Sequence, residues 1–418
     1  MPDDPTPAHE TEALATLVRE SGRDVLATLA RQVGDLGLAE DAVQDAVLRA
    51  LEAWPRDGLP PNPTAWLRLT ARRRAIDLLR QARSRGAREE RAVATDPELR
   101  PGWTADLEPS VLHDDLLRLL FTCCHPALPT TSRVALALRT LGGLTEPEIA
   151  RALLTTTDAV AKRLVRARAK IRDAAIPYAV PPDHALPERW EGVLATVHLM
   201  LNEGYAATSG EALTRPPLVA EALRLARLLV RLQPDDAGAL GLLALALLQD
   251  SRRAARVGPD GAAVLLADQD RATWDAEAIR EGVELLGEAL RRAGADPAGR
   301  PHRFVVQAAV AACHALAPTF EQTDWAAIVS WYDVLLRLDP SPVVALNRAV
   351  AVAHADDAST GLALVDAIEG LQDYPYWHAA RAVLLRRLGR DDEAAEADAV
   401  AARLPVSRPV LQRLDGRT

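Results

Sequence analysis

Basic side chains gather in two stretches of this sequence, and the chemistry they suit is the binding of a polyanion. The first stretch holds Arg68, Arg72, Arg73, Arg74, Arg80, Arg83, Arg85, Arg88 and Arg91. The second holds Lys162, Arg163, Arg166, Arg168, Lys170 and Arg172. Guanidinium and ammonium groups bind anionic groups such as phosphates, so two separated clusters predict two contacts with a polyanion. For either cluster alone, a solvated helix face is the alternative.

A stretch of different character precedes the first cluster. A helix expected over 38–54 has a polar face made of Asp41, Gln44, Asp45 and Glu52. Its opposite face carries apolar residues at helical spacing, namely Val43, Val47, Leu51 and Trp54, which are expected inward. Because carboxylates repel phosphates, the polar face suits a protein partner better than DNA.

Metal and enzyme chemistry finds little support. Cys123, Cys124 and His125 are consecutive, and adjacent side chains on a helix point about 100° apart, so they converge poorly on one ion. We expect packed thiols there. The sequence contains no glycine-rich phosphate loop and no H-E-x-x-H motif, so we expect no catalytic residue, metal or cofactor. The segment 201–210, LNEGYAATSG, is expected to form a buried polar turn, with a ligand site as the alternative.

Composition sets the fold class and the compartment. The 418 residues are 49% hydrophobic and 26% charged, with only 4% aromatic residues, which favours an all-α protein. The apolar runs are far shorter than the roughly 20 residues of a membrane span, and the first residues do not resemble a signal peptide. With three cysteines, this predicts a cytoplasmic protein. Residues 1–178 hold 25 basic and 25 acidic side chains, so the net charge of −9 falls on the remainder.

The elements that must position the first basic cluster are two helices and a loop. Prolines and a glycine over 55–63 predict the loop. A helix is expected from about Pro63 to Arg83, with its arginines outward and with Trp66, Leu69, Ile76 and Leu79 inward. A linker poor in apolar residues follows.

The second basic cluster lies in a helix-turn-helix pattern over 144–171. Thr145 is placed as an N-cap with Glu148 three residues later and Pro147 in the first turn. After a turn over 154–157, a longer helix has Val160, Leu164 and Ile171 inward and the basic residues outward. The second helix of such a pair enters the major groove of DNA. A generic helical hairpin is the alternative.

The rest of the chain is rich in Ala and Leu and contains internal repeats. A pattern that begins at Arg231 recurs from Arg337, 106 residues later, and Arg348-Ala349-Val350 recurs 33 residues later from Arg381. A period near 34 in helical sequence is typical of tetratricopeptide (TPR) repeats, which stack into a solenoid. The segment 258–275 breaks the period and is expected to be an inserted loop.

Taken together, the first 178 residues resemble an extracytoplasmic-function (ECF) sigma factor of bacterial RNA polymerase. The resemblance lies in AEDAVQDAVLRALEAW and NPTAWLRLTARRRAIDLLR, similar to region 2, and LTEPEIARALLTTTDAVAKRLVRARAKI, similar to region 4. The whole chain resembles the subgroup with a long TPR-like C-terminal extension. The implied domains are region 2 (1–88), a linker (89–110), region 4 (111–178), a connector (179–187) and the extension (188–418).

The resemblance also implies partners and contact residues, namely core RNA polymerase and promoter DNA. Polymerase would contact Asp41, Gln44, Asp45 and Arg49. The minus-10 element would contact Asn62, Trp66, Arg68, Arg72, Arg73, Arg74, Asp77 and Arg80. The minus-35 element would contact Thr156, Thr157, Lys162, Arg163, Arg166, Arg168 and Lys170. Ala161 and Leu154 depart from the usual lysine and turn glycine of region 4, so the promoter sequence is not transferable.

The extension is expected to be a regulatory module, through an intramolecular contact or a protein partner. Two other functions stay open: a helix-turn-helix regulator that binds DNA without polymerase, and a TPR scaffold. The first leaves the acidic helix over 38–54 and the arginine-rich helix over 66–83 unexplained. The second supposes that the N-terminal part has decayed, and the intact Asp41, Gln44 and basic helix argue against decay.

Overall fold

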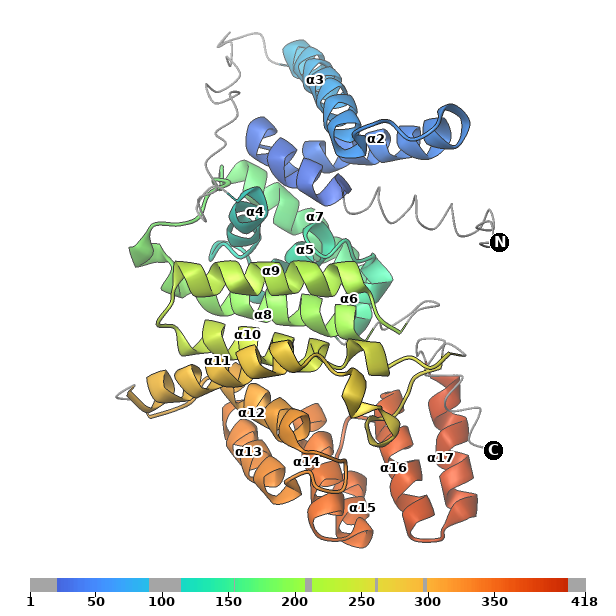
Figure 1. Ribbon diagram of the computed structural model, residues 1–418. Coiled ribbons are helices and arrows are strands. Elements are labelled where there is room, and N and C mark those ends of the chain that lie inside the picture. Colours follow the sequence, from blue (N-terminus) through green and yellow to red (C-terminus); the bar gives the residue numbers. More distant parts are fainter. Residues whose placement is uncertain are drawn as a thin grey trace. The chain divides into compact units, whose positions relative to one another are not determined.

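The computed structural model describes residues 21–89, 114–153, 155–206, 213–259, 262–295 and 299–404, without the side chains of 82–89. Within these ranges the chain is built of α-helices, short 3-10 turns and one isolated bridge between Val257 and Ala263, which confirms the all-α expectation (Figure 1). The chain divides into two compact units, Met1–Thr196 and Val197–Thr418.

The first unit begins with a helix described over 21–33. The elements that follow are α2 (Leu36–Asp57), α3 (Pro63–Glu89), α4 (Asp115–Cys123), α5 (Thr130–Thr140), α6 (Glu146–Ala152), α7 (Thr157–Asp173), a 3-10 turn (Asp183–Ala185) and α8 (Pro187–Tyr205). The boundary between the units falls inside α8.

Alanines bring α2 and α3 together. Ala39, Ala42, Ala46 and Ala50 form the fully buried stripe of α2, and Leu67, Ala71 and Ala75 form that of α3. The sequence placed Leu51 and Leu69 inward, but they are 38% and 48% exposed. That prediction was wrong because small residues every three or four positions allow the closest helix approach, and the larger leucines fall beside that seam.

The end of α2 also differs from expectation. The helix continues through Pro55 to Asp57, where the sequence predicted a loop from residue 55. A proline in the last turn forfeits only one helical hydrogen bond. The helix ends at Gly58, whose φ of 82° favours glycine and whose N–H donates to the carbonyl of Trp54.

The helix-turn-helix is formed by α6 and α7, as predicted. The Glu148 carboxylate accepts hydrogen bonds from the backbone N–H of Thr145 at 2.7 Å and from its hydroxyl at 2.8 Å, which fixes the start of α6. Val160, Leu164 and Ile171 of α7 are buried, against α5 and α6. Leu154, which the sequence placed in the turn, lies outside the described residues.

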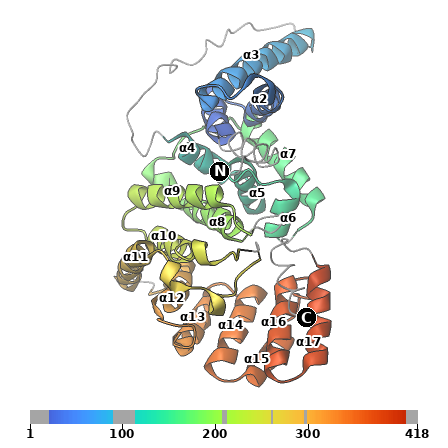
Figure 2. The ribbon, with the colours of Figure 1, turned by 45° about the vertical axis from the view of Figure 1, so that its right-hand side comes forward.

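The second unit is a succession of helix pairs (Figure 2). Its elements after α8 are α9 (Pro216–Leu232), α10 (Ala237–Asp250), three 3-10 turns (Arg253–Ala255, Leu266–Asp268 and Arg271–Thr273), α11 (Ala276–Ala295), α12 (Arg303–Leu316), α13 (Trp325–Leu338), α14 (Pro342–Ala355), α15 (Ala358–Asp366), α16 (Pro375–Arg387) and α17 (Asp391–Arg403). Two of these 3-10 turns, Leu266–Asp268 and Arg271–Thr273, lie in the segment 258–275 that the sequence marked as an insertion, and Arg253–Ala255 precedes it.

The 33-residue repeat has a structural counterpart. The Nε of Arg348 in α14 pairs with Asp333 in α13 at 2.6 Å. The Nε of Arg381 in α16 pairs in the same way with Asp366, the last residue of α15, at 2.8 Å. Both pairs span 15 residues, so the two sequence copies make equivalent ties between consecutive helices.

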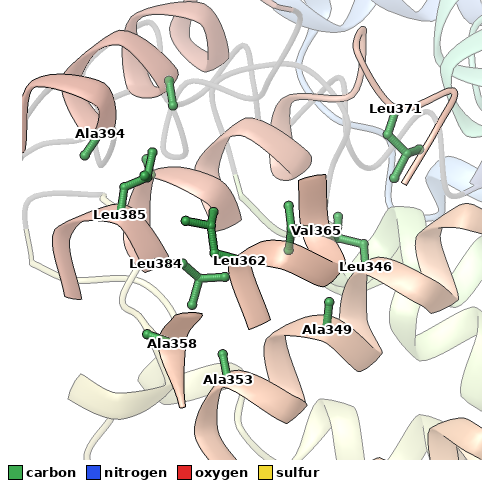
Figure 3. Close-up of a cluster of buried hydrophobic side chains, with 12 residues drawn as sticks. Leu346, Ala349, Ala353, Ala358, Leu362, Val365, Leu371, Leu384, Leu385 and Ala394 are labelled. Atoms are coloured by element: carbon green, nitrogen blue, oxygen red, sulfur yellow. The ribbon is translucent and has the colours of Figure 1, made fainter. Parts of the chain in front are cut away.

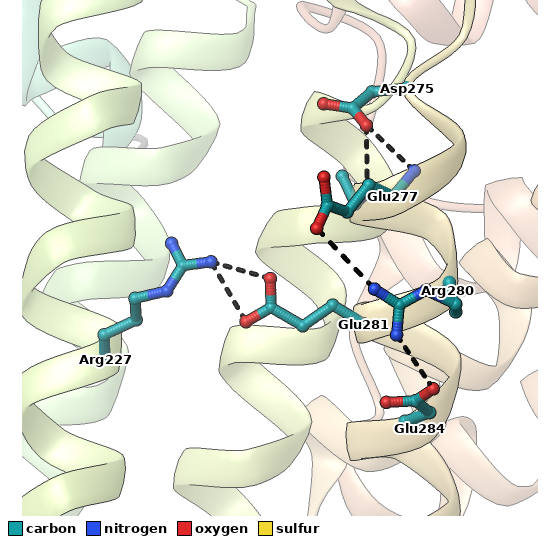
Figure 4. A network of polar contacts seen from close by, with 7 residues as sticks. Arg227, Asp275, Glu277, Arg280, Glu281 and Glu284 are labelled. Carbon is teal, nitrogen blue, oxygen red and sulfur yellow. Dashed lines mark hydrogen bonds and ion pairs between the residues drawn. The ribbon is translucent and has the colours of Figure 1, made fainter.

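Apolar and polar contacts both join these helices. Figure 3 shows a core cluster in which Leu346 of α14, Leu362 of α15 and Leu385 of α16 meet among alanines. Figure 4 shows a surface network in which Arg227 of α9 donates to both oxygens of Glu281 of α11, at 3.0 and 2.7 Å.

Candidate polymerase and promoter interface

The first half of α7 presents the predicted minus-35 side chains to solvent. Thr156 caps the helix, and its hydroxyl accepts from the backbone N–H of Ala159 at 3.2 Å. The predicted contact residues with exposed side chains are Thr156, Thr157, Lys162, Arg166 and Lys170, whereas Arg163 is half-buried. An exposed helix N-terminus with cationic side chains suits phosphate oxygens and guanine edges.

Arg168 is placed differently from the other predicted minus-35 residues. Its Nε pairs at 2.6 Å with the carboxylate of Glu40 in α2, and only 26% of its side chain is exposed. Burial raises the pKa of Glu40, while Arg168 and Arg139 act in the opposite direction. Arg168 is thus engaged by a carboxylate in this conformation.

The outer face of α2 combines polar and apolar side chains. The predicted residues Asp41, Gln44 and Arg49 are exposed. Leu48 lies among them at 52% exposure, and Leu51 is exposed near the end of the same helix. Apolar side chains beside polar ones are typical of protein interfaces. Sequence reasoning missed Leu48, although its place one turn after Gln44 could have shown it.

Asp45 does not stand free on that face. Its carboxylate makes a hydrogen-bonded ion pair with the Nε of Arg74 in α3, and both side chains are partly exposed. The pair ties together a residue predicted to contact polymerase and a residue predicted to contact the minus-10 element.

The predicted minus-10 residues lie at the start of α3 and along it. The side-chain oxygen of Asn62 accepts from the backbone N–H of Ala65 at 3.0 Å, so Asn62 caps the helix. Trp66 packs edge-on against Trp54 of α2, with ring centroids 5.4 Å apart, and is half-buried. The remaining predicted residues divide into exposed Arg68, Arg73, Asp77 and Arg80 and half-buried Arg72 and Arg74.

The adjacent cysteines are packed thiols, as predicted. Cys123 and Cys124 are fully buried. Cys123 lies 3.4 Å from the hydroxyl of Thr140, and Cys124 lies 3.8 Å from that of Thr196. Burial raises the pKa of both thiols, that of Cys124 to about 12, so neither ionises near neutral pH.

Three parts of the chain match known protein families. Residues 17–85 match the family described as Sigma-70 region 2, and residues 118–171 match Sigma-70, region 4. Residues 189–290 match a family of unknown function (DUF6596).

Two groups of relatives differ in how much of the chain they share. An uncharacterized protein of Rhizobium meliloti (strain 1021) is 43% identical over 374 residues, 89% of this chain and 87% of that protein. The ECF RNA polymerase sigma factor SigK of Mycobacterium ulcerans (strain Agy99) is 30% identical over 159 residues, 37% of this chain and 81% of that protein. SigK of Mycobacterium tuberculosis (strain ATCC 25618 / H37Rv) is 28% identical over 169 residues, 40% and 87% of the two chains.

The matches to regions 2 and 4 identify the class of protein as a transcription initiation factor. The chain belongs to the ECF family of RNA polymerase sigma factors and carries a C-terminal extension. Core RNA polymerase and promoter DNA are therefore its partners. Across the described residues, no helix has the length and apolarity needed to cross a bilayer.

Proposed function

We propose that this sigma factor recognises a minus-35 element with α7 and a minus-10 element with the Asn62 loop and α3, in the cytoplasm. The outer face of α2 docks on core polymerase. The extension over 188–418 regulates these contacts. The observation that carries the proposal is α7, whose buried Val160 and Leu164 fix a helix that holds Lys162 and Arg166 in solvent.

Run-off transcription with purified core polymerase on a genomic fragment pool tests promoter recognition. New transcript starts that share two upstream elements are the expected result. Substituting both Lys162 and Arg166 with alanine removes two cations from the DNA-facing half of α7, so starts that depend on the minus-35 element should be lost. The control is Arg172→Ala, an exposed arginine in the last turn of α7. Equal activity of both variants would contradict this assignment of α7.

The polymerase contact has its own test. Leu48→Asp places a charge at the centre of the exposed α2 face and should weaken binding to core polymerase by at least tenfold, because a desolvated charge is costly in an interface. The matched control is Leu316→Asp, since Leu316 is an exposed leucine in the second unit, at 61%. Undiminished binding of Leu48→Asp would show that this face does not meet polymerase.

The regulatory role of the extension needs a carefully placed truncation. The sequence suggests a cut near Pro182, but the first half of α8 belongs to the first unit. There Trp190 stacks on Phe121 of α4, with ring centroids 6.4 Å apart, and Gly192 and Thr196 adjoin Cys124. A chain that ends after Ala206 retains these contacts. Changed promoter-dependent transcription by that chain supports regulation by the extension, and unchanged transcription argues against it.

A further inference from the structure

Three arginines alternate with two aromatic rings in the second unit. The guanidinium carbon of Arg256 lies 3.4 Å from the ring centroid of Tyr205, and that of Arg252 lies 5.9 Å from it. Arg252 also lies 5.7 Å from the ring centroid of Trp274, and Arg271 lies 4.5 Å from it. We call these five residues the arginine ladder. Four of them come from the segment between α10 and α11, and Tyr205 ends α8.

The ladder concentrates positive charge without matching carboxylates. Among the described residues, none of its three arginines makes an ion pair with a carboxylate, although the unit as a whole is acidic. The neighbouring Asp250 forms its ion pair with Arg253, at 2.5 Å. On the surface of α11, by contrast, Arg280 pairs with both Glu277 and Glu284 (Figure 4).

Burial makes this arrangement electrostatically costly. Arg256 is 9% exposed and Trp274 is 7% exposed. Burial lowers the pKa of Arg256 and of Arg271, and the charge of Arg252 lowers both further. Cation–π contacts of this kind are individually weak and offset only part of the cost of three neighbouring cations.

Hydrogen-bonding capacity is also unused at one end of the ladder. Nη1 of Arg271 donates to the carbonyls of His314 and Ala317, at 2.7 and 2.8 Å. Within the described residues, the buried Nη2 of Arg271, Nε1 of Trp274 and Nδ1 of His314 have no hydrogen-bond partner. Buried polar atoms without partners are uncommon in folded proteins, and here they belong to Arg271 and to two residues that Arg271 contacts, Trp274 and His314.

We propose that the arginine ladder binds an oxyanion, the phosphate or carboxylate group of a small molecule. An oxyanion has no protons to donate and several lone pairs to accept, which is the complement of guanidinium and indole N–H groups. Its charge neutralises the arginines that lack carboxylate partners, and the aromatic rings fix their planes. The proposal concerns the extension alone and does not depend on the promoter contacts.

Isothermal titration calorimetry of the full-length protein, with inorganic phosphate in one arm and citrate in the other, tests this site. Ionic strength is held constant with chloride. Saturable binding of at least one anion is expected, and the arm that saturates identifies phosphate or carboxylate as the ligand chemistry. Absence of saturable binding in both arms would overturn the proposal.

Variants locate the site. Arg252→Gln and Arg271→Gln should each weaken binding at least tenfold, whereas Arg280→Gln, which removes an equal charge from the surface of α11, should leave it unchanged. Within the described residues, Arg252 donates one hydrogen bond, to the hydroxyl of Tyr205 at 2.5 Å, whereas Arg271 donates to two backbone carbonyls, so substitution of Arg252 disturbs the fold less. Circular dichroism checks that each variant is folded. Equal binding by Arg252→Gln and Arg280→Gln would place the anion elsewhere and refute the ladder as its site.

Discussion

The carboxylate of Glu40 in α2 and the guanidinium of Arg168 in α7 form an ion pair at 2.6 Å that joins the region 2 and region 4 parts of the first unit. Two further contacts cross the same junction: Arg31 pairs with Asp115 at 2.8 Å, and Arg23 donates to the carbonyl of Leu141 at 3.4 Å. The predicted minus-35 contact Arg168 thus has a carboxylate partner whenever the two parts are arranged in this way.

Breaking this pair should strengthen DNA binding if Arg168 contacts a phosphate. We expect Glu40→Gln to raise the affinity for a minus-35 duplex severalfold at low salt. In this variant Arg168 does not have to leave a carboxylate in order to bind a DNA phosphate. The plot of log affinity against log salt should steepen by about one. Fluorescence anisotropy at several salt concentrations measures both quantities.

The control for this prediction is Glu52→Gln. Glu52 is exposed on the same helix, and its substitution removes the same charge without touching Arg168. If both variants bind DNA alike, the gain reflects net charge rather than release of Arg168. Arg168→Gln should bind more weakly than either variant.

A half-buried histidine should make the second unit sensitive to acid. His198 packs against Phe304, with ring centroids 4.8 Å apart, and burial together with Arg303 lowers its pKa to about 4. In the unfolded chain its pKa is near 6.5, so the unfolded state binds the extra proton between these values. Stability therefore falls as pH drops from 6.5 towards 4, by no more than about 1.4 kcal/mol per pH unit from this group.

Urea unfolding at pH 7 and pH 5 measures the effect. His198→Gln should lose less stability between the two pH values than the wild type, because its side chain does not titrate. His184→Gln, a substitution at an exposed histidine, serves as the control and should follow the wild type. A wild-type loss no larger than that of His198→Gln would refute the assignment.

The three thiols should differ in reactivity. Cys313 is half-buried, whereas Cys123 and Cys124 are fully buried. Burial raises the pKa of all three thiols, so reaction with an aromatic disulfide at pH 8 should be slow throughout. One thiol should react in the native protein and three in denaturant. Cys313→Ser should abolish the native reaction, and a remaining native thiol would contradict the packing of the cysteine pair.

Local signals made much of this fold predictable. The capping of α6 by Thr145 and Glu148 and the buried face of α7 are set within a few residues, so the sequence located the helix-turn-helix. The inward placements of Leu51 and Leu69 failed because large apolar side chains were weighted above alanine, while close helix approach buries the alanines. The Glu40–Arg168 pair links residues 128 positions apart, which no local spacing reveals. The sequence did not predict the arginine ladder either, because its arginines lie in irregular segments that have no periodic spacing.

A glycine determines how closely α10 and α12 approach. A Cβ at Gly241 would lie 2.6 Å from the backbone N of Val305 and 2.9 Å from its Cα, inside van der Waals contact with atoms that belong to a helix. Gly241→Ala should therefore push the helices apart and destabilise the second unit by about 1–3 kcal/mol, the usual cost of overpacking. Gly287→Ala offers the matched comparison, because the atom of another residue nearest to a Cβ there is the flexible end of Arg291, at 3.6 Å. In the middle of α11 this substitution should stabilise by about 0.5–1 kcal/mol, since alanine loses less backbone entropy than glycine on folding. Urea midpoints that move in opposite directions would establish that the contact with Val305, and not helix propensity, sets the effect at position 241. A shift in the same direction for both variants would show that α10 and α12 have room to separate.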